Sequence, residues 1–207
     1  MPKPQGLKTE VKESKMGAEA VVEILRSEKK VVKVRPRKEY RIKELDEKIR
    51  KDRTRREARL MNKAKASVDL PRVLSVDEKK FTIEMEFIDG VPVKELGAGI
   101  DEVAGRIGEQ VGRLHSIGIA HNDLTTSNMI SKEGRIFLID FGLATRGRVE
   151  DFATDLKVLH ECLEASHKIT DKTWGLLVAG YKKGNPDWEA VLKRLEKVYS
   201  RGRYKAR

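Results

Sequence analysis

Two polar residues five positions apart, Asp123 and Asn128 in the stretch HNDLTTSNMI, carry the clearest chemical signal in this sequence. A carboxylate at Asp123 can accept a hydrogen bond from an attacking hydroxyl group or water. Asn128 offers an uncharged oxygen that suits Mg²⁺, and Asp140, twelve residues later and followed by Phe141 and Gly142, offers a second hard oxygen ligand. We therefore predict that Asp123 is catalytic and that Asn128 and Asp140 bind Mg²⁺.

The order of these residues along the chain favours chemistry over simple turn formation. Taken singly, each Asp or Asn would be assigned to a turn, where such residues are common. Transfer of a phosphoryl group needs a grip on the phosphates, metal ions that offset their charge and a carboxylate that orients the nucleophile. The chain offers candidates for all three parts in the expected order, which indicates ATP and Mg²⁺ as cofactors.

The grip on the phosphates is expected from Lys33, a lysine between valines in VVKV. A lysine on a half-buried strand needs an anionic partner, and in protein kinases a strand lysine binds the α- and β-phosphates and pairs with a helix glutamate. We predict Lys33 as a catalytic and ATP-binding residue with Glu57 as its partner. Glu44 and Glu47 come too early on the same predicted helix, and a surface pair with Arg53 is the alternative role of Glu57.

The stretch MEFI, at the end of a predicted hairpin, is expected to face the adenine base of ATP. A linker at this place in a nucleotide-binding lobe contacts adenine with backbone groups. By that analogy, we predict that the Glu86 carbonyl and the Ile88 amide hydrogen-bond the base. Met85 is predicted to close the pocket behind it, which is compatible with an ordinary role in the hydrophobic core.

A phosphate-covering loop is predicted at Gly17, Ala18 and Glu19, before the first long strand. This stretch lacks the full G-x-G-x-x-G pattern, and its single glycine allows one close approach of the backbone to a phosphate. We assign all three residues to cofactor binding, with Glu19 adding an acidic side chain near the phosphates.

Hydrophobic periodicity places these residues on a β-rich first lobe and a helical second lobe of an α+β fold. Residues 89–92 interrupt the pattern, which predicts an N-lobe at 1–88, a C-lobe at 89–200 and a basic tail at 201–207. Residues 1–15 are expected to be loose or to form one short strand. The predicted strands are 20–25, 31–34, 73–76, 81–87, 128–130 and 136–139, and the predicted helices are 42–66, 100–117, 150–166, 170–182 and 187–199. In the strand at 81–87, the alternation of residue types places four side chains on one face: Phe81, Ile83, Met85 and Phe87.

The net charge of +11 is unevenly distributed along the chain. Residues 33–65 contain fifteen Lys or Arg against six Asp or Glu, a surplus that suits either a solvated helix face or the phosphate backbone of a nucleic acid. The single cysteine, Cys162, cannot form an internal disulfide, and no apolar run is long enough to span a bilayer. We therefore expect a cytoplasmic protein without membrane contact.

Three further polar residues are expected to support the HNDLTTSNMI loop. His115 and His121 are predicted to form structural hydrogen bonds around it. Asp155, on the following helix, is predicted to accept hydrogen bonds from backbone amides of the loop, with a plain surface position as the alternative.

Together these motifs resemble the p53-related protein kinase family, the small atypical kinase and ATPase subunit of the KEOPS (EKC) complex. The resemblance covers about Gly17 to Arg207. It rests on GAEA, Lys33, the Glu57 helix, MEFIDG, HNDLTTSNMI, LIDFGLA and VEDFATDLKVL. It implies a reduced bilobal protein-kinase-like fold that lacks the activation segment, and the charged composition suggests an archaeal member.

The resemblance also implies an activity and partners. Members of this family are Mg²⁺-dependent ATPases and atypical Ser/Thr kinases that support threonylcarbamoyl modification of adenosine in tRNA. They bind the threonylcarbamoyl-transferase subunit of KEOPS and a small subunit at the N-lobe. Their basic tail reaches the partner and tRNA, and here that tail would consist of Arg201, Arg203, Lys205 and Arg207.

One residue departs from the H-R-D pattern of ordinary protein kinases, because Asn122 replaces the arginine. That arginine grips a phosphorylated activation loop. Only 65 residues follow Gly142, with no A-P-E motif and a predicted helix from about Glu150. Regulation by loop phosphorylation is therefore not expected, and contact with a partner protein is the natural substitute.

Two other functions fit parts of the sequence. A RIO-like Ser/Thr kinase with its own protein substrates would share the short lobe, although RIO-type enzymes are expected to lack the Asp-Phe-Gly pattern at 140–142. A non-catalytic RNA-binding scaffold would explain the basic helix and tail, but not the complete set of nucleotide-site residues named above. Binding of Mg-ATP separates either enzyme from the scaffold.

Overall fold

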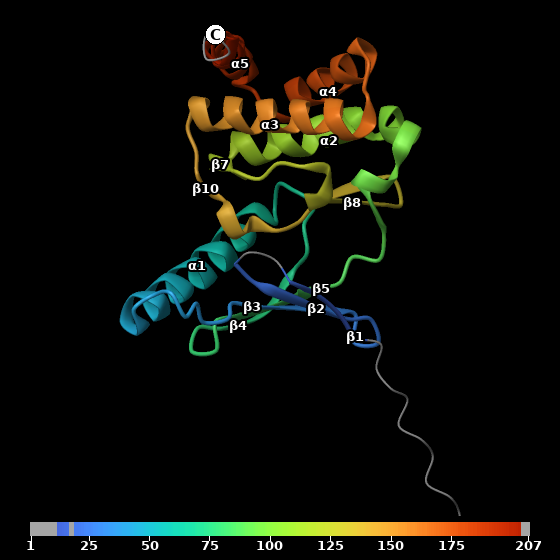
Figure 1. The fold of residues 1–207 in the computed structure, drawn as a ribbon. Coiled ribbons are helices and arrows are strands. Elements are labelled where there is room, and N and C mark those ends of the chain that lie inside the picture. The colour runs from blue at the N-terminus through green and yellow to red at the C-terminus, as the bar shows by residue number, and fades with distance from the viewer. Residues whose placement is uncertain (1–11, 17–18, 204–207) are drawn as a thin grey trace, which may run out of the picture. The chain divides into compact units, whose positions relative to one another are not determined.

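The computed structural model describes residues 12–16 and 19–203 and divides the chain into two compact units (Figure 1). Unit 1 comprises residues 1–55 and 73–87, and unit 2 comprises residues 56–72 and 88–207. Helix α1 (Lys43–Ala64) contributes its first part to unit 1 and its last part to unit 2. The segment 56–72 therefore groups with the second unit, although it lies before the predicted lobe boundary.

Unit 1 is built on a five-stranded antiparallel sheet with the strand order β1-β2-β3-β5-β4. Its strands are β1 (Lys12–Met16), β2 (Val21–Leu25), β3 (Lys30–Val34), β4 (Val73–Asp77) and β5 (Thr82–Glu86). Short polar turns join β2 to β3 and β4 to β5, as the sequence predicts for two hairpins. The pairing of β3 with β5 joins the two hairpins and places Lys33 opposite Ile83 and Val31 opposite Met85.

The predicted alternation in β5 is confirmed for its middle and wrong at its start. Ile83 and Met85 are buried, as expected for the inward face. Phe81 lies before the strand with φ of +56° and belongs to the turn, although its carbonyl still accepts a hydrogen bond of 3.1 Å from Arg35 N. The Arg50 guanidinium covers the Phe81 ring at 3.8 Å, which shields an aromatic side chain that the sheet does not bury.

Unit 2 contains four helices that pack in two pairs, α2 with α4 and α3 with α5 (Figure 1). The helices are α2 (Ile100–Ser116), α3 (Val149–His167), α4 (Asp171–Gly184) and α5 (Trp188–Arg203). All four predicted helices are confirmed, and α5 extends beyond its predicted end into the segment assigned to the basic tail. Across the described residues, none of the helices combines the length and the apolar character that crossing a bilayer demands.

Glycines allow α2 and α4 to approach with their backbones in contact. A Cβ atom at Gly108 would lie 1.9 Å from the Leu177 carbonyl oxygen, and one at Gly180 would lie 1.8 Å from the Gly105 oxygen. No side chain fits such separations, so these positions accept only glycine at this helix spacing. The close packing fixes α2, which leads directly into the predicted catalytic loop.

Short strands and 3₁₀ turns frame the loop between α2 and α3. One small sheet has the order β6-β8-β9, and a two-stranded ladder pairs β10 with β7. These strands are β6 (Val91–Pro92), β7 (Ile119–Ala120), β8 (Met129–Lys132), β9 (Arg135–Leu138) and β10 (Thr145–Arg146). The predicted strand pair with a turn at Gly134 corresponds to β8 and β9, and Gly134 adopts a φ of +74°.

Candidate functional site

Asp123 and Asn128 lie together in the loop that follows β7. The Asn128 side-chain amide donates to the Asp123 carbonyl oxygen at 2.9 Å and to Asp123 Oδ2 at 2.8 Å. Because both partners can only accept, the nitrogen of Asn128 must face Asp123 and its Oδ1 atom faces elsewhere. Asn128 therefore orients the carboxylate of Asp123 and keeps one oxygen as a possible metal ligand.

Asp140 is positioned beside Asn128 by the β8–β9 pairing. The Asn128 carbonyl accepts a hydrogen bond of 2.9 Å from the amide of Ile139, the residue directly before Asp140. Asp140 adopts a left-handed conformation with φ of 60°, and its carboxylate accepts a bond from Gly142 N at 3.1 Å. The donor set of one carboxylate and one amide oxygen fits Mg²⁺, which proteins bind through one or two such groups together with phosphates and water.

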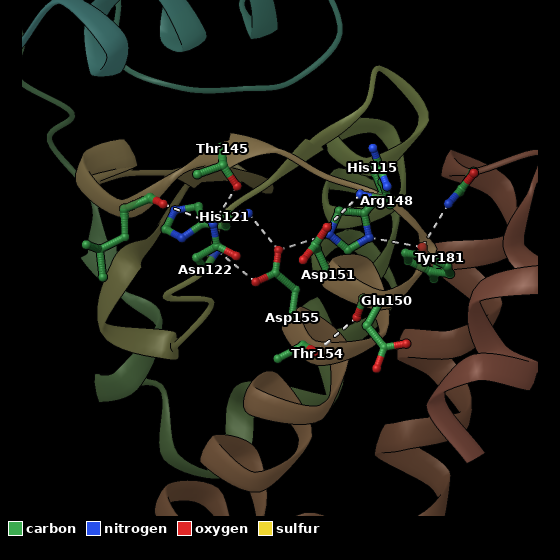
Figure 2. Close-up of polar contacts among 12 residues, drawn as sticks. His115, His121, Asn122, Thr145, Arg148, Glu150, Asp151, Thr154, Asp155 and Tyr181 are labelled. Atoms are coloured by element: carbon green, nitrogen blue, oxygen red, sulfur yellow. Dashed lines mark hydrogen bonds and ion pairs between the residues drawn. The ribbon is translucent and has the colours of Figure 1, made fainter. Parts of the chain in front are cut away.

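Asp155 supports the loop from helix α3 (Figure 2). Its carboxylate, which is 1% exposed, accepts hydrogen bonds from His121 N at 2.6 Å and from Asn122 N at 2.8 Å. These bonds confirm the prediction that Asp155 holds backbone amides of the loop. A buried carboxylate needs such partners, because burial without them would be costly.

A buried hydrogen-bond chain links Asp155 to helices α2 and α4. His115 Nε2 lies 3.3 Å from Asp155 Oδ2, and its Nδ1 atom lies 3.0 Å from the Tyr181 hydroxyl. Asn185 donates to that hydroxyl at 2.8 Å, so Tyr181 donates to Nδ1 and the neutral His115 ring donates to Asp155. Burial lowers the pKa of His115 despite the nearby carboxylate, in agreement with a neutral ring.

His121 links the loop to the strand that carries Asp140. The ring is fully buried, and its Nε2 atom lies 3.1 Å from the carbonyl oxygen of Ile139. It also packs against Phe141, with ring centroids 5.1 Å apart. His115 and His121 therefore both have the structural roles predicted for them.

Asn122 binds the segment that follows Asp140-Phe141-Gly142 (Figure 2). Its side-chain amide donates to the Leu143 carbonyl at 3.0 Å and to the Thr145 hydroxyl at 2.8 Å. Its φ of +61° is left-handed, a conformation that Asn tolerates better than most residues. The sequence predicts that Asn122 cannot bind a phosphorylated activation loop, but it gave no indication of these two hydrogen bonds.

The activation segment of ordinary protein kinases is missing. Strand β10 ends at Arg146 and helix α3 begins at Val149, so two residues join them. The amide of Gly147 also bonds the Gly118 carbonyl at 3.1 Å, which ties this connection to the end of α2. The predicted reduced C-lobe is confirmed in this respect.

The remaining predicted site residues are distributed over both units. In unit 1, Lys33 on β3 is buried with 6% exposure, Met85 is buried on β5, and Glu86 ends that strand. In unit 2, Glu57 on α1 is 1% exposed and Ile88 is also buried. The pairing of Lys33 with Glu57 and the contacts to adenine stay predictions, and Gly17 and Ala18 lie outside the described residues.

Glu19 has partners that the sequence analysis did not identify. Its carboxylate forms ion pairs with Arg53 on α1 and with Arg41 in the segment before that helix. Burial would raise the pKa of Glu19, but the hydrogen bonds and charges of Arg53 and Arg41 outweigh it and lower the pKa. No local sequence pattern could have revealed these pairs, since 34 and 22 positions separate the partners.

Comparison with known proteins identifies the domain. The model of the RIO domain matches residues 6–162. The Asp-Phe-Gly pattern at 140–142 therefore does not separate this chain from the RIO family, and that expected contrast was wrong. Among solved structures, the Rio2 kinase of Chaetomium thermophilum, crystallised with ADP/Mg²⁺ and phosphoaspartate, has the same fold, with a TM-score of 0.64 at 16% identity over 94% of this chain and 71% of the kinase.

Archaeal relatives are much more similar. The KEOPS complex subunit Bud32 of Pyrococcus abyssi is 40% identical over 86% of both chains. A probable serine/threonine-protein kinase BUD32 homolog of Archaeoglobus fulgidus is 39% identical over 91% of this chain and 94% of its own. A probable bifunctional tRNA threonylcarbamoyladenosine biosynthesis protein of Methanosarcina mazei is 42% identical over 91% of this chain. The chain spans about a third of that bifunctional protein, 35% of its length. With this fold, these motifs and this degree of identity, the chain belongs to the RIO-domain family, together with the archaeal Bud32 proteins.

Proposed function

We propose that this protein is an Mg²⁺-dependent ATPase and atypical Ser/Thr kinase subunit of a KEOPS complex, where it supports threonylcarbamoyladenosine modification of tRNA. The observation that carries the proposal is the bonded pair of Asp123 and Asn128 beside Asp140, in a chain 40% identical to a KEOPS subunit. The names of the Methanosarcina and Pyrococcus relatives support the role in tRNA modification.

The residues of the loop have defined roles in this proposal. Asn128 and Asp140 would hold Mg²⁺, which offsets the charge that builds up on the phosphates. The Asn128 amide bonds the Asp123 carboxylate in one orientation, so Asp123 can accept a hydrogen bond from the attacking hydroxyl or water. Asp155 fixes the backbone amides of His121 and Asn122, directly before Asp123, and the His121 ring bonds the backbone directly before Asp140.

The proposed nucleotide-binding residues of the first lobe complete the site. Lys33 is buried on β3 and Glu57 is buried on α1, and buried charges of opposite sign are stable when they are paired. This burial supports the proposed pair that would bind the α- and β-phosphates. The Glu86 carbonyl and the Ile88 amide are proposed to bind adenine, with Met85 behind the base.

The short connection between β10 and α3 supports control by partners instead of by loop phosphorylation. Asn122 fixes Leu143 and Thr145 without any phosphate group, so this segment is ordered in the unmodified chain. We propose that the threonylcarbamoyl-transferase subunit and a small N-lobe-binding subunit regulate the site, and that water is the main nucleophile in the complex.

An ATPase assay with the transferase subunit present tests the site. Asp123→Ala and Asp140→Ala are expected to reduce ATP hydrolysis about 100-fold or more, because each removes a group that acts on the reacting phosphate. Asp171→Ala, at an exposed carboxylate that begins helix α4, is the matched control and should hydrolyse ATP like the wild type. Hydrolysis at the wild-type rate by both site variants would refute the proposal.

A second candidate is a Ser/Thr kinase with its own protein substrates, favoured by the RIO-domain match and by the name of the Archaeoglobus relative. Strong phosphate transfer to an added protein, without any partner subunit, would support this candidate. Calorimetry with Mg-ATP tests the alternative of a non-catalytic RNA-binding scaffold, since that alternative is favoured if the chain binds no nucleotide.

A further inference from the structure

Five charged side chains in unit 1 form an alternating chain of cations and anions, which we name the Glu19 latch: Arg50, Asp46, Arg41, Glu19 and Arg53. Arg50 Nε lies 2.7 Å from Asp46 Oδ2, and Arg41 Nη1 lies 3.8 Å from Asp46 Oδ1. Arg41 Nη2 lies 3.4 Å from Glu19 Oε1, and Arg53 Nη1 lies 2.6 Å from Glu19 Oε2.

The most deeply buried member of the Glu19 latch is Asp46, on the first turn of α1. Its side chain is fully buried, and it also accepts a hydrogen bond of 3.2 Å from Lys38 N. Burial would raise the pKa of Asp46, but the bonds from Lys38 and Arg50 and the charges of Arg50 and Arg41 lower it. A buried carboxylate with these partners stays ionised at neutral pH and holds Arg41 in place.

Glu19 connects the latch to the nucleotide site, because the sequence predicts a role for Glu19 in cofactor binding. Glu19 directly follows Gly17 and Ala18, and its carboxylate is only partly exposed. Without a cation, this carboxylate would repel the phosphates of a bound nucleotide. Arg53 and Arg41 neutralise it and connect it to helix α1 and to the segment before that helix.

We infer that the Glu19 latch holds Glu19, which is predicted to bind the cofactor, against α1 and so sets the affinity of the protein for Mg-ATP. The inference rests on the proposed function, because it concerns the same nucleotide site. Glu19, Arg41 and Arg53 are positioning residues in this account, and none of them acts on the reacting atoms. The pairs join parts of the chain far apart in sequence, so their loss frees the Glu19 side chain, which lies between strands β1 and β2, from α1 and from the segment before that helix.

The opposing view is that these are ordinary surface ion pairs. Exposed pairs of this kind contribute little, since solvent screens them and ordering the side chains costs entropy. The same helix provides such a pair for comparison, because exposed Arg55 bonds Glu78 with two nitrogens, at 2.9 and 2.6 Å. Arg55→Gln is therefore the matched control for Arg53→Gln.

The first measurement needs no nucleotide. Hydrogen exchange of the backbone amides at 19–22 is expected to quicken in both Glu19→Gln and Arg53→Gln, and to stay at the wild-type rate in Arg55→Gln. The sheet amides of β3 and β5 serve as the internal control for folding. Unchanged exchange at 19–22 in both latch variants would overturn the inference, whatever the protein does with ATP.

The second measurement is a double-mutant cycle on Mg-ATP binding by calorimetry. Glu19→Gln and Arg53→Gln are each expected to raise the Kd for Mg-ATP about three- to ten-fold. The double variant should bind no more weakly than the weaker-binding single variant, because both substitutions break the same contact. The KM for ATP should rise alike with kcat unchanged, and Arg53→Lys should restore part of the affinity. The inference would be overturned if the fold-changes in Kd of the two single variants multiplied in the double variant, or if neither substitution altered the Kd. Failure of the wild type to bind Mg-ATP would instead refute the proposed function.

Discussion

Asn122 shows how one residue of the HNDLTTSNMI loop determines what the loop is connected to. Its two side-chain hydrogen bonds hold the backbone at Leu143 and the hydroxyl of Thr145. The left-handed φ places the amide so that it reaches both. The contact to the segment after Asp140 is therefore part of the fold and needs no phosphorylated residue.

A pair of variants separates the side chain of Asn122 from its backbone conformation. Asn122→Gly keeps the left-handed conformation and loses the bonds, which should cost about 1 kcal/mol of unfolding free energy. Asn122→Ala should cost about 1 kcal/mol more, because alanine is strained at positive φ. Urea denaturation measures both, and equal stability of the two variants would contradict the strain.

His115 gives the folded protein a predictable dependence on pH. Its pKa is lowered in the folded state, chiefly by burial, whereas the unfolded chain has the ordinary value of about 6.5. Below that value the unfolded state binds the additional proton, so this contribution to stability is present above about pH 6.5 and is lost as the pH falls.

The wild type should therefore lose stability between pH 7 and pH 5, with a slope from this residue of at most about 1.4 kcal/mol per pH unit. His115→Gln is expected to be less stable at pH 7, because it breaks the chain to Asp155 and Tyr181, and to show a shallower slope. Urea titrations at several pH values measure both quantities. An unchanged slope would mean that the folded state does not keep His115 neutral.

At the scale of elements, the α2–α4 contact depends on glycine. Gly108→Ala and Gly180→Ala would place a Cβ atom against backbone oxygens, so the helices would have to separate. We expect each to destabilise the protein by about 1–3 kcal/mol, the range of overpacked cores. Gly175→Ala is the control on the same helix, since nothing lies within 4 Å of its Cβ position.

That control should be neutral or stabilising by up to about 1 kcal/mol, because alanine favours a helix more than glycine does. Thermal unfolding followed by circular dichroism compares the three variants. A Gly108→Ala protein as stable as Gly175→Ala would show that the helices can move apart without cost.

At the scale of the whole molecule, the basic surplus divides into internal and external charges. Arg53 belongs to the Glu19 latch, and Arg55 pairs with Glu78, so the two are not simply available for nucleic acid. Lys48 and Lys51 are exposed at positions i and i+3 and form one stripe along α1, and Lys51 Nζ lies no closer than 4.0 Å to Glu78. Any contact of this helix with tRNA is best sought on that stripe.

Charge reversal on the stripe tests the proposed tRNA contact. Lys48→Glu with Lys51→Glu should weaken tRNA binding and reduce the slope of log K against log salt by about 2, one unit per lost phosphate contact. Lys172→Glu, at an exposed position on α4, is the control. An unchanged slope measured by filter binding or fluorescence anisotropy would leave the stripe as a solvated helix face.

The order of the elements and the residues of the HNDLTTSNMI loop could be predicted from the sequence, because periodicity and motif spacing are local properties of the chain. The helices and the two hairpins followed from these local patterns. The turn position of Phe81, the partners of Glu19 and the bonds of Asn122 did not. The partners of Glu19 and of Asn122 are distant in the chain, and an ion pair or a side-chain hydrogen bond forms only where the tertiary fold brings such groups together. The positive φ of Phe81 likewise depends on how the turn between β4 and β5 closes, which the alternation of residue types does not specify.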